Sequence, residues 1–213
     1  MKKVKLKICG MKYSENIQKI AMLKPDYLGF IFWDKSIRKY EQNEITNLDL
    51  NIKKVGVFVD SFIDEILHKI KVFKLDVIQL HGTETDDFCR ELKKENIKII
   101  KAFSVDNNFD FNKLNKYKNA VDYFLFDTKG KLPGGNGLRF DWHVLEKYTL
   151  KKPFFLSGGI GLTEINELKK FLNSDLASYC YAIDINSRFE DNPGLKNKND
   201  IKKFKKLLYE NKI

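Results

Sequence analysis

The chain has 213 residues, with 39 lysines and arginines against 29 aspartates and glutamates, so its formal net charge is +10. Hydrophobic residues make up 43% of it, which is too much for a disordered chain and enough for one globular core. No apolar run reaches the ~20 residues of a membrane-spanning helix, and the charged N-terminal segment has no signal-peptide pattern. We therefore expect a single cytoplasmic domain over residues 1–213.

Cysteine and histidine usage argues against two kinds of site. The three cysteines are odd in number and far apart, which excludes a disulfide scaffold. The three histidines lack the spacing typical of metal ligands. We therefore expect no metal. The residues concerned are Cys9, Cys89, Cys180, His68, His81 and His143.

The positive charge is most simply a solvated lysine face, because lysine-rich segments such as 202–206 also carry apolar residues at helical spacing. A basic nucleic-acid-binding protein is the alternative from a different class. The sequence lacks the basic runs interleaved with aromatic residues that favour it. We expect a small phosphorylated substrate as the partner, no nucleic acid and no membrane, and either a monomer or a homodimer.

Short apolar runs rich in β-forming residues recur along the chain, and a turn follows each one. Runs of this kind are typical of parallel strands that are covered on both faces. We expect eight strands: Val4–Gly10, Tyr27–Trp33, Lys54–Asp60, Val77–Gly82, Ile97–Ser104, Tyr123–Thr128, Pro153–Gly159 and Ser178–Asn186.

Segments with apolar residues three and four positions apart alternate with these strands and predict amphipathic helices. They are Ser61–Lys74, Glu84–Glu95, Thr163–Asn173 and a final helix through Ile201 and Leu208, with Glu41–Leu50 as the weakest prediction. Eight predicted strands that alternate with helices favour a single-domain (β/α)8 (TIM) barrel. At 213 residues the chain is short for this fold, which typically takes ~250. A doubly wound open sheet is the alternative.

In a barrel of this kind the reactive groups lie where strands end. Alternation along the first strand points Lys5, Lys7 and Cys9 into the barrel if Leu6 and Ile8 face the helices. A thiol near cations is expected to be partly ionised and able to act as a base or nucleophile, although an inert buried thiol is the commoner case. An interior lysine needs a partner, and Asp184 on the last strand is the leading candidate.

Asp127 ends the sixth strand after four apolar or aromatic residues. Limited solvation favours the protonated carboxyl, which suits a general acid, whereas a turn or N-cap aspartate is the alternative. Arg38 follows the second strand and is either a two-point clamp for a carboxylate or a surface arginine. Lys7, His81 and Asp184 are expected to join Arg38 in binding the substrate.

Two turns suggest a phosphate site. Gly158 and Gly159 follow the seventh strand, and Ser187 and Arg188 follow the eighth. Backbone amides in such turns can approach an anion closely, and many barrels bind a substrate phosphate after these two strands. The glycine-rich segment 133–137 has no P-loop lysine and is expected to form a mobile lid.

Taken together, an ordered set of motifs resembles the phosphoribosylanthranilate isomerase family, whose members are barrels of the ribulose-phosphate-binding type. The matching motifs run from the first strand to the last helix. They are Lys7-Ile8-Cys9-Gly10, Gly29-Phe30-Ile31-Phe32 with Ser36-x-Arg38, Gln79-Leu80-His81-Gly82, Phe126-Asp127-Thr128, Ser157-Gly158-Gly159 and Asp184-x-Asn186-Ser187-x-x-Glu190-x-x-Pro193-Gly194-x-Lys196.

The resemblance implies a cofactor-free Amadori rearrangement of N-(5-phosphoribosyl)anthranilate in tryptophan biosynthesis. It assigns Asp127 as general acid, Cys9 as the thiolate base and Arg38 as the carboxylate-binding residue, with phosphate bound by the turns at Gly158-Gly159 and Ser187-Arg188. Arg188-Phe189 stands where many relatives have Gly-Val. Another phosphate-binding barrel isomerase of tryptophan or histidine biosynthesis is the nearest alternative, and such an enzyme is expected to have an aspartate in place of Cys9.

Overall fold

The structure is a computed structural model that describes residues 4–45, 48–128 and 141–210. The predicted lid at residues 133–137 lies outside this part of the chain. In the described ranges no helix is long and apolar enough to cross a membrane.

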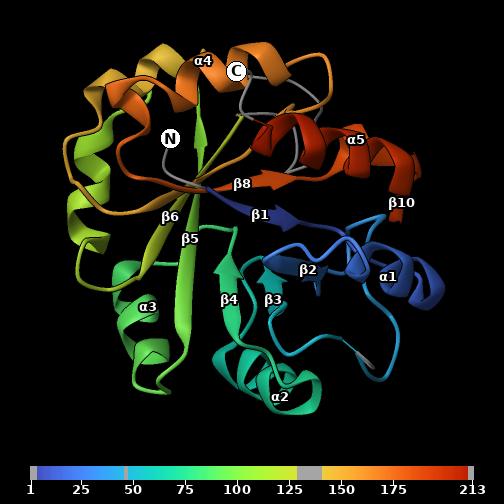
Figure 1. Ribbon diagram of the computed structural model, residues 1–213. Coiled ribbons are helices and arrows are strands. Elements are labelled where there is room, and N and C mark those ends of the chain that lie inside the picture. Colours follow the sequence, from blue (N-terminus) through green and yellow to red (C-terminus); the bar gives the residue numbers. More distant parts are fainter. Residues whose placement is uncertain (1–3, 46–47, 129–140, 211–213) are drawn as a thin grey trace.

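Eight parallel strands close into a barrel in chain order, and pairing of β1 with β8 completes the ring (Figure 1). The barrel prediction is therefore confirmed over the open sheet. All eight strands lie within one residue of a predicted run or inside it. Their bounds are β1 Lys5–Ile8, β2 Tyr27–Ile31, β3 Lys53–Phe58, β4 Val77–Leu80, β5 Lys98–Val105, β6 Tyr123–Thr128, β7 Phe154–Leu156 and β8 Cys180–Ile185.

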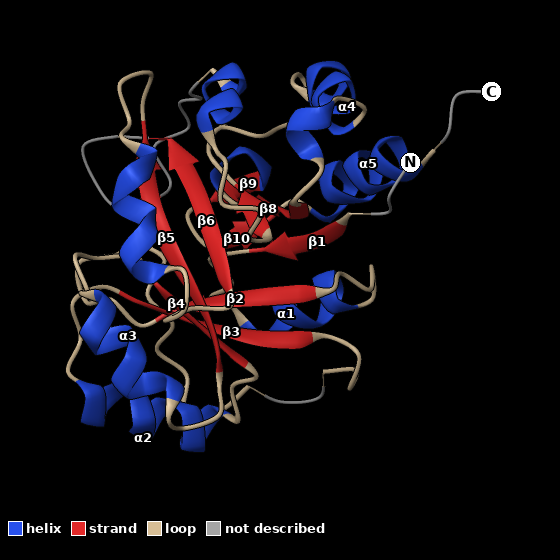
Figure 2. Cartoon of the chain, turned by 90° about the vertical axis from the view of Figure 1, so that its left-hand side faces the viewer, coloured by secondary structure: helices blue, strands red, loops and turns tan. Residues whose placement is uncertain are grey.

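Helices cover the barrel unevenly (Figure 2). The α-helices are α1 Ser14–Ala21, α2 Ile63–Phe73, α3 Asp86–Lys93, α4 Ile165–Leu172 and α5 Lys198–Tyr209. The structure confirms the predicted helices around α2, α3, α4 and α5. Figure 1 shows α4 and α5 lying beside each other, with α5 over β8 and β1.

Three connections contain no α-helix among their described residues. The helix predicted at Glu41–Leu50 is wrong, because the described residues of that segment contain no helix. After β5 and β6 the chain forms 3-10 helices at Phe111–Tyr117 and Trp142–Lys147. The first of these carries two asparagines and two aromatic residues, which are weak helix formers.

The barrel interior has an apolar half and a polar half. Near the strand N-termini it is filled by Tyr27, Val55, Val77, Ile100, Leu125 and Phe155 with neighbouring alanines. Tyr123 and Tyr181 pack there with ring centroids 4.8 Å apart, and the hydroxyls of Tyr27 and Tyr181 lie 3.0 Å apart. These four aromatic residues, Tyr27, Tyr123, Phe155 and Tyr181, form the aromatic floor of the barrel. The polar half lies above it, toward the strand C-termini.

After β8 the chain makes a small hairpin before α5. A short 3-10 helix at Ser187–Phe189 leads into β9 (Glu190–Asn192), which pairs antiparallel with β10 (Leu195–Lys196). Hydrogen bonds between Asn16 of α1 and the backbone of Lys196 join the hairpin to the first helix, at 2.8 Å and 2.9 Å. The hairpin therefore lies close to the end of β1.

Candidate active site

Strand β1 places a lysine and a cysteine inside the barrel. Leu6 and Ile8 pack outward in the hydrophobic layer, so Lys7 and Cys9 face inward. The same alternation predicted Lys5 inside the barrel, and this was wrong. Lys5 lies at the N-terminal rim of the barrel, outside the aromatic floor. Its side chain is 46% exposed there, and its Nζ atom donates to Oδ1 of Asp26 at 2.8 Å.

Lys7 pairs with Asp184, as predicted. The two residues stand opposite each other on β1 and β8, and Lys7 Nζ donates to Asp184 Oδ2 at 2.7 Å. Burial acts to lower the pKa of Lys7, but Asp184 and Cys9 outweigh it and raise this pKa. Burial raises the pKa of the Asp184 carboxyl, and Lys7 offsets this only in part. Within the described residues, the second oxygen of Asp184, Oδ1, is buried without a hydrogen-bond partner. That oxygen is available to a bound molecule.

Cys9 is buried in the polar half of the barrel, with 5% of its surface exposed. Its sulfur occupies the space beside Gly29 of β2, where a Cβ atom would lie 2.8 Å from Sγ. Burial raises the pKa of the Cys9 thiol; Lys7 and Lys196 lower it, and Asp184 adds to the increase. Burial therefore works against the partly ionised thiol that we expected, and the two cations work in its favour.

Asp127 and His81 face each other across the barrel mouth. Asp127 is buried at the end of β6, and its Oδ2 atom lies 3.5 Å from Nε2 of His81, which follows β4. The other oxygen, Oδ1, accepts the backbone N–H of Thr128 at 3.0 Å. Gln79 Nε2 lies 3.1 Å from His81 Nδ1. If Gln79 donates there, the imidazole proton sits on Nε2, toward Asp127.

Electrostatic interactions connect the two sides of the site. Asp184 interacts with Lys7 on one side and with Asp127 and His81 on the other. Cys9 in turn interacts with Lys7 and Asp184. The predicted base and acid therefore belong to one buried polar cluster on the inner face of the barrel. This cluster consists of Lys7, Cys9, Gln79, His81, Asp127 and Asp184.

The two predicted phosphate turns lie next to each other. Gly158 and Gly159 have positive φ angles of 93° and 63°. A Cβ atom at Gly158 would lie 2.1 Å from Thr128 Oγ1, so this turn packs against the end of β6. A Cβ atom at Gly161 would lie 3.2 Å from Cβ of Arg188. The turns after β7 and β8 therefore meet close to Asp127, with Ser187 half-buried and Arg188 exposed.

Arg38 points toward the hairpin rather than into solvent. Its Nε and Nη2 atoms donate to both carboxylate oxygens of Glu190 at 2.8–3.0 Å. A Cβ atom at Gly10 would lie 2.9 Å from Arg38 Cδ, so the arginine packs against the turn that follows Cys9. The arrangement holds the guanidinium in a fixed orientation beside the predicted base.

Two charged residues at the site were given no role by sequence reasoning. Lys196 is fully buried, and its Nζ atom contacts Asn186 Oδ1 at 2.6 Å and Glu190 Oε1 at 2.7 Å. Burial lowers the pKa of Lys196 to about 8. Glu190 has 5% of its side chain exposed and contacts both Lys196 and Arg38. The only signal in the sequence was their place in the motif that begins at Asp184.

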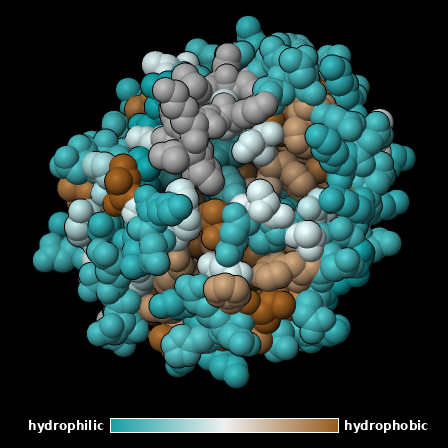
Figure 3. All heavy atoms as spheres, turned by 180° about the vertical axis from the view of Figure 1, so that it is seen from behind, coloured by the Kyte–Doolittle hydropathy of each residue, from teal (hydrophilic) through white to brown (hydrophobic). Residues whose placement is uncertain are grey.

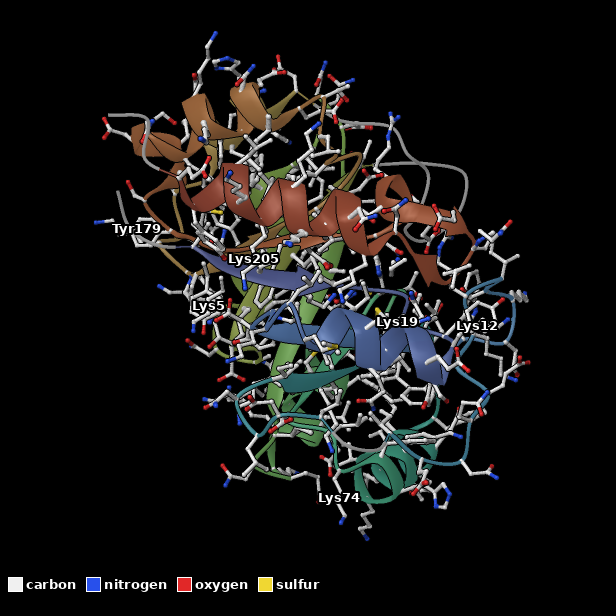
Figure 4. The ribbon with its side chains drawn as sticks, turned by 45° about the vertical axis from the view of Figure 1, so that its right-hand side comes forward. Lys5, Lys12, Lys19, Lys74, Tyr179 and Lys205 are labelled. Carbon is white, nitrogen blue, oxygen red and sulfur yellow. The ribbon has the colours of Figure 1, made fainter. Side chains whose placement is uncertain are left out.

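The outer surface does not carry these features. Among the described residues, no group of three or more histidine, cysteine, aspartate or glutamate side chains is placed to hold a metal ion. Figure 3 shows a largely hydrophilic surface with small apolar patches. The five lysines labelled in Figure 4 lie on different elements across the outside of the molecule. Some of them are in ion pairs, as in Lys19 with Glu15 at 3.8 Å.

Residues 6–206 match the protein family described as N-(5'-phosphoribosyl)anthranilate isomerase. The chain belongs to this family. A relative of that name from Parabacteroides distasonis is 41% identical over 204 residues, which is 93% of this chain and 90% of the relative. The chain thus spans nearly the whole length of this curated member.

Solved structures of phosphoribosylanthranilate isomerases share the fold. One, in complex with reduced 1-(o-carboxyphenylamino)-1-deoxyribulose 5-phosphate, is 28% identical with a TM-score of 0.76 and covers 97% of this chain and 98% of its own. Another is described as a monomer generated from the dimeric isomerase of Thermotoga maritima. It is 27% identical, has a TM-score of 0.74 and covers 97% of this chain and 98% of its own.

Proposed function

We propose that the protein catalyses the Amadori rearrangement of N-(5'-phosphoribosyl)anthranilate to 1-(2-carboxyphenylamino)-1-deoxyribulose 5-phosphate in tryptophan biosynthesis, with Asp127 as the acid and Cys9 as the base. As a member of its family, the protein is an isomerase. The observation that carries the assignment of roles is the single buried cluster in which Asp184 interacts with Lys7 on the side of Cys9 and with Asp127 and His81 on the other.

In the first step Asp127 donates a proton to the ribose ring oxygen. The bond between that oxygen and C1 breaks, and the nitrogen lone pair forms the iminium. Asp127 is buried at the end of β6, the end of the strand at which barrels of this kind carry their reactive groups. The imidazole of His81, 3.5 Å from Asp127 Oδ2, is placed to stabilise the carboxylate that results.

In the second step the Cys9 thiolate removes the proton from C2, and the electron pair of that bond neutralises the iminium to give an enolamine. The enolamine then tautomerises to the ketone: C1 gains a proton and the C2 hydroxyl loses one. The base must be ionised for this step, and Lys7 and Lys196 both favour the thiolate. Asp184 Oδ1, which has no partner among the described residues, is available to the hydroxyls of the opened sugar.

The remaining predicted residues bind the two ends of the substrate. Adjacent turns at Gly158–Gly159 and Ser187–Arg188 provide backbone amides and a cation for the phosphate. Arg38, held beside the Cys9–Gly10 turn, provides a guanidinium for the anthranilate carboxylate. Lys7, His81 and Asp184 are assigned to the ribose between them.

The proposal is tested by following the loss of phosphoribosylanthranilate fluorescence, with the substrate made in place from anthranilate. Cys9→Ser and Asp127→Asn are each expected to lower kcat by at least ~100-fold while circular dichroism stays native. Cys89→Ser is the matched control, because Cys89 is a buried thiol in the outer hydrophobic layer. Near-normal turnover by either site variant would refute the assignment.

Two further expectations remain part of the proposal. We predict a cytoplasmic protein that is a monomer or a homodimer. We also predict that it has no nucleic-acid or membrane partner. Light scattering with size-exclusion chromatography distinguishes the two states of assembly.

Activity toward an aminoimidazole-carboxamide ribotide, in place of the anthranilate substrate, would favour the alternative isomerase.

A further inference from the structure

The hairpin after β8 carries a buried cation whose place in the site the reaction steps leave open. Lys196 ends β10, and its side chain is completely buried. It lies outside the barrel interior, so it does not belong to the layer of inward-facing strand residues. A lysine in such a position costs free energy unless charged partners hold it, and the residues that do so are specific.

Two contacts fix the position of the Lys196 ammonium group. Nζ lies 2.6 Å from Asn186 Oδ1 and 2.7 Å from Glu190 Oε1. Its backbone is held by Asn16 of α1 at 2.9 Å and 2.8 Å. Both the ammonium group and the backbone of Lys196 are therefore held in place, which leaves the cation little freedom to move away from its neighbours.

The same asparagine connects the cation to the turn that carries Cys9. A Cβ atom at Gly10 would lie 2.6 Å from Asn186 Oδ1, the atom that Lys196 contacts. The backbone N–H of Cys9 donates to Ile185 O at 2.9 Å, directly before Asn186. The cation is thus separated from the Cys9–Gly10 turn by one amide group, and it interacts with the thiol itself.

We propose that Lys196 is a positioning residue for the reaction, held by Glu190 and Asn186 so that its charge, together with that of Lys7, stabilises the Cys9 thiolate. The inference rests on the proposed role of Cys9 as base. Under this proposal Glu190 has two roles, because its carboxylate binds both the Lys196 ammonium group and the Arg38 guanidinium. The hairpin β9–β10 thereby becomes a part of the catalytic machinery rather than a connection to α5.

Every charged group that faces the thiol contributes to its ionisation. Lys7 on β1 and Lys196 on β10 favour the thiolate, and Asp184 on β8 opposes it. Glu190 and Arg38 act on Lys196 with opposite signs, and Asp127 and His81 act on Asp184. Because burial already raises the pKa of the Cys9 thiol, the thiolate fraction at neutral pH depends strongly on each remaining cation.

A thiolate titration tests this without any substrate. The ultraviolet absorbance of each protein is recorded against pH, and the spectrum of the same protein carrying Cys9→Ser is subtracted. Lys196→Met is expected to move the midpoint of the Cys9 titration upward by about one pH unit, which is about tenfold less thiolate at neutral pH. The acidic limb of kcat/KM against pH is expected to move in the same direction.

Two further variants keep the test decisive. Glu190→Gln preserves the shape of the side chain and leaves Lys196 in place. A buried lysine without its carboxylate partner loses its proton, so we expect the midpoint of the Cys9 titration to lie above that of the wild type in this variant too. Lys101→Met is the matched control, since Lys101 is a buried lysine paired with Glu84 at 3.0 Å, on the outer side of β5. It is expected to leave the Cys9 midpoint unchanged, even if it destabilises the protein.

The outcomes separate this inference from the proposed function. An unchanged Cys9 midpoint in natively folded Lys196→Met, or in Glu190→Gln if the first does not fold, would overturn the role of Lys196. A shifted midpoint in a protein that does not isomerise the anthranilate substrate would uphold the role of Lys196 and refute the proposed reaction instead. The titration depends only on the thiol, so the two results are independent.

Discussion

Lys7 and Asp184 stand opposite each other on β1 and β8, and their charged groups meet at 2.7 Å inside the closed barrel. This ion pair spans the seam at which the last strand joins the first. It also lies between the predicted base and the predicted acid, since Lys7 interacts with Cys9 and Asp184 interacts with Asp127.

Breaking the pair from one side should be costly. Lys7→Met leaves Asp184 as an uncompensated buried carboxylate and is expected to lower the free energy of unfolding by about 3–5 kcal/mol. The double variant Lys7→Met, Asp184→Leu removes both charges and is expected to recover much of that loss. Urea unfolding of the single variants and of the double variant measures the coupling. Strictly additive losses would show that the pair contributes no mutual stabilisation.

The turn after β7 should not tolerate a side chain at its first glycine. Gly158→Ala forces a Cβ atom to within 2.1 Å of Thr128 Oγ1 at a φ of 93°, so we expect a loss of about 1–3 kcal/mol and a KM raised at least ~10-fold. Gly161→Ala is the matched control, because the shortest contact of its Cβ is 3.0 Å and involves the flexible side chain of Glu164. Thermal melts and inhibition by inorganic phosphate provide the comparison. Equal effects of the two variants would refute the special role of Gly158.

His81 should affect turnover more than binding. His81→Leu removes the polar group 3.5 Å from Asp127 Oδ2, and we expect kcat to fall ~10–100-fold with a much smaller change in KM. His81→Gln retains a donor and is expected to recover part of the loss. Steady-state kinetics on both variants distinguish the two effects. A rise in KM alone would assign His81 to substrate binding only.

Glu190 should make stability sensitive to acid. Burial acts to raise its pKa, but Arg38 and Lys196 outweigh burial and hold the pKa below its ordinary value of 4.5. A carboxyl with a depressed pKa in the folded state stabilises the protein above its unfolded pKa, and that contribution disappears as the pH falls through the folded value. The stability gap between wild type and Glu190→Gln is therefore expected to be full near neutral pH and to shrink below pH 4.5. Chemical denaturation at a series of pH values measures the gap, and a gap that grows in acid would contradict this reasoning.

The strands could be predicted from the sequence because a parallel strand covered on both faces is rich in apolar residues. Phe124-Leu125-Phe126 before Asp127 is an example, since all three residues are buried. Alternation along the strand then placed Lys7 and Cys9 correctly. It failed at Lys5. The periodicity predicts which way a side chain points but not how far along the barrel it lies, and Lys5 lies at the solvent-exposed N-terminal rim.

Other parts of the site depend on packing between distant segments. Glu190 and Lys196 occur in a polar stretch with a proline and a glycine, which is typical of an exposed turn. Lys196 is held against α1 by Asn16, and Glu190 is held between Lys196 and Arg38. The ionisation of Cys9 likewise depends on how completely the surrounding strands exclude water. Neither effect leaves a local pattern in the sequence.

The aromatic floor has a kinetic consequence. Tyr27, Tyr123, Phe155 and Tyr181 fill the end of the barrel opposite the polar cluster, with ring centroids 4.8–5.5 Å apart for Tyr123–Tyr181 and Tyr27–Phe155. With that end blocked, the ribulose must depart through the same opening by which the ribosyl compound arrived. Substrate and product cannot pass each other there, so we expect the product to compete with the substrate for the barrel mouth.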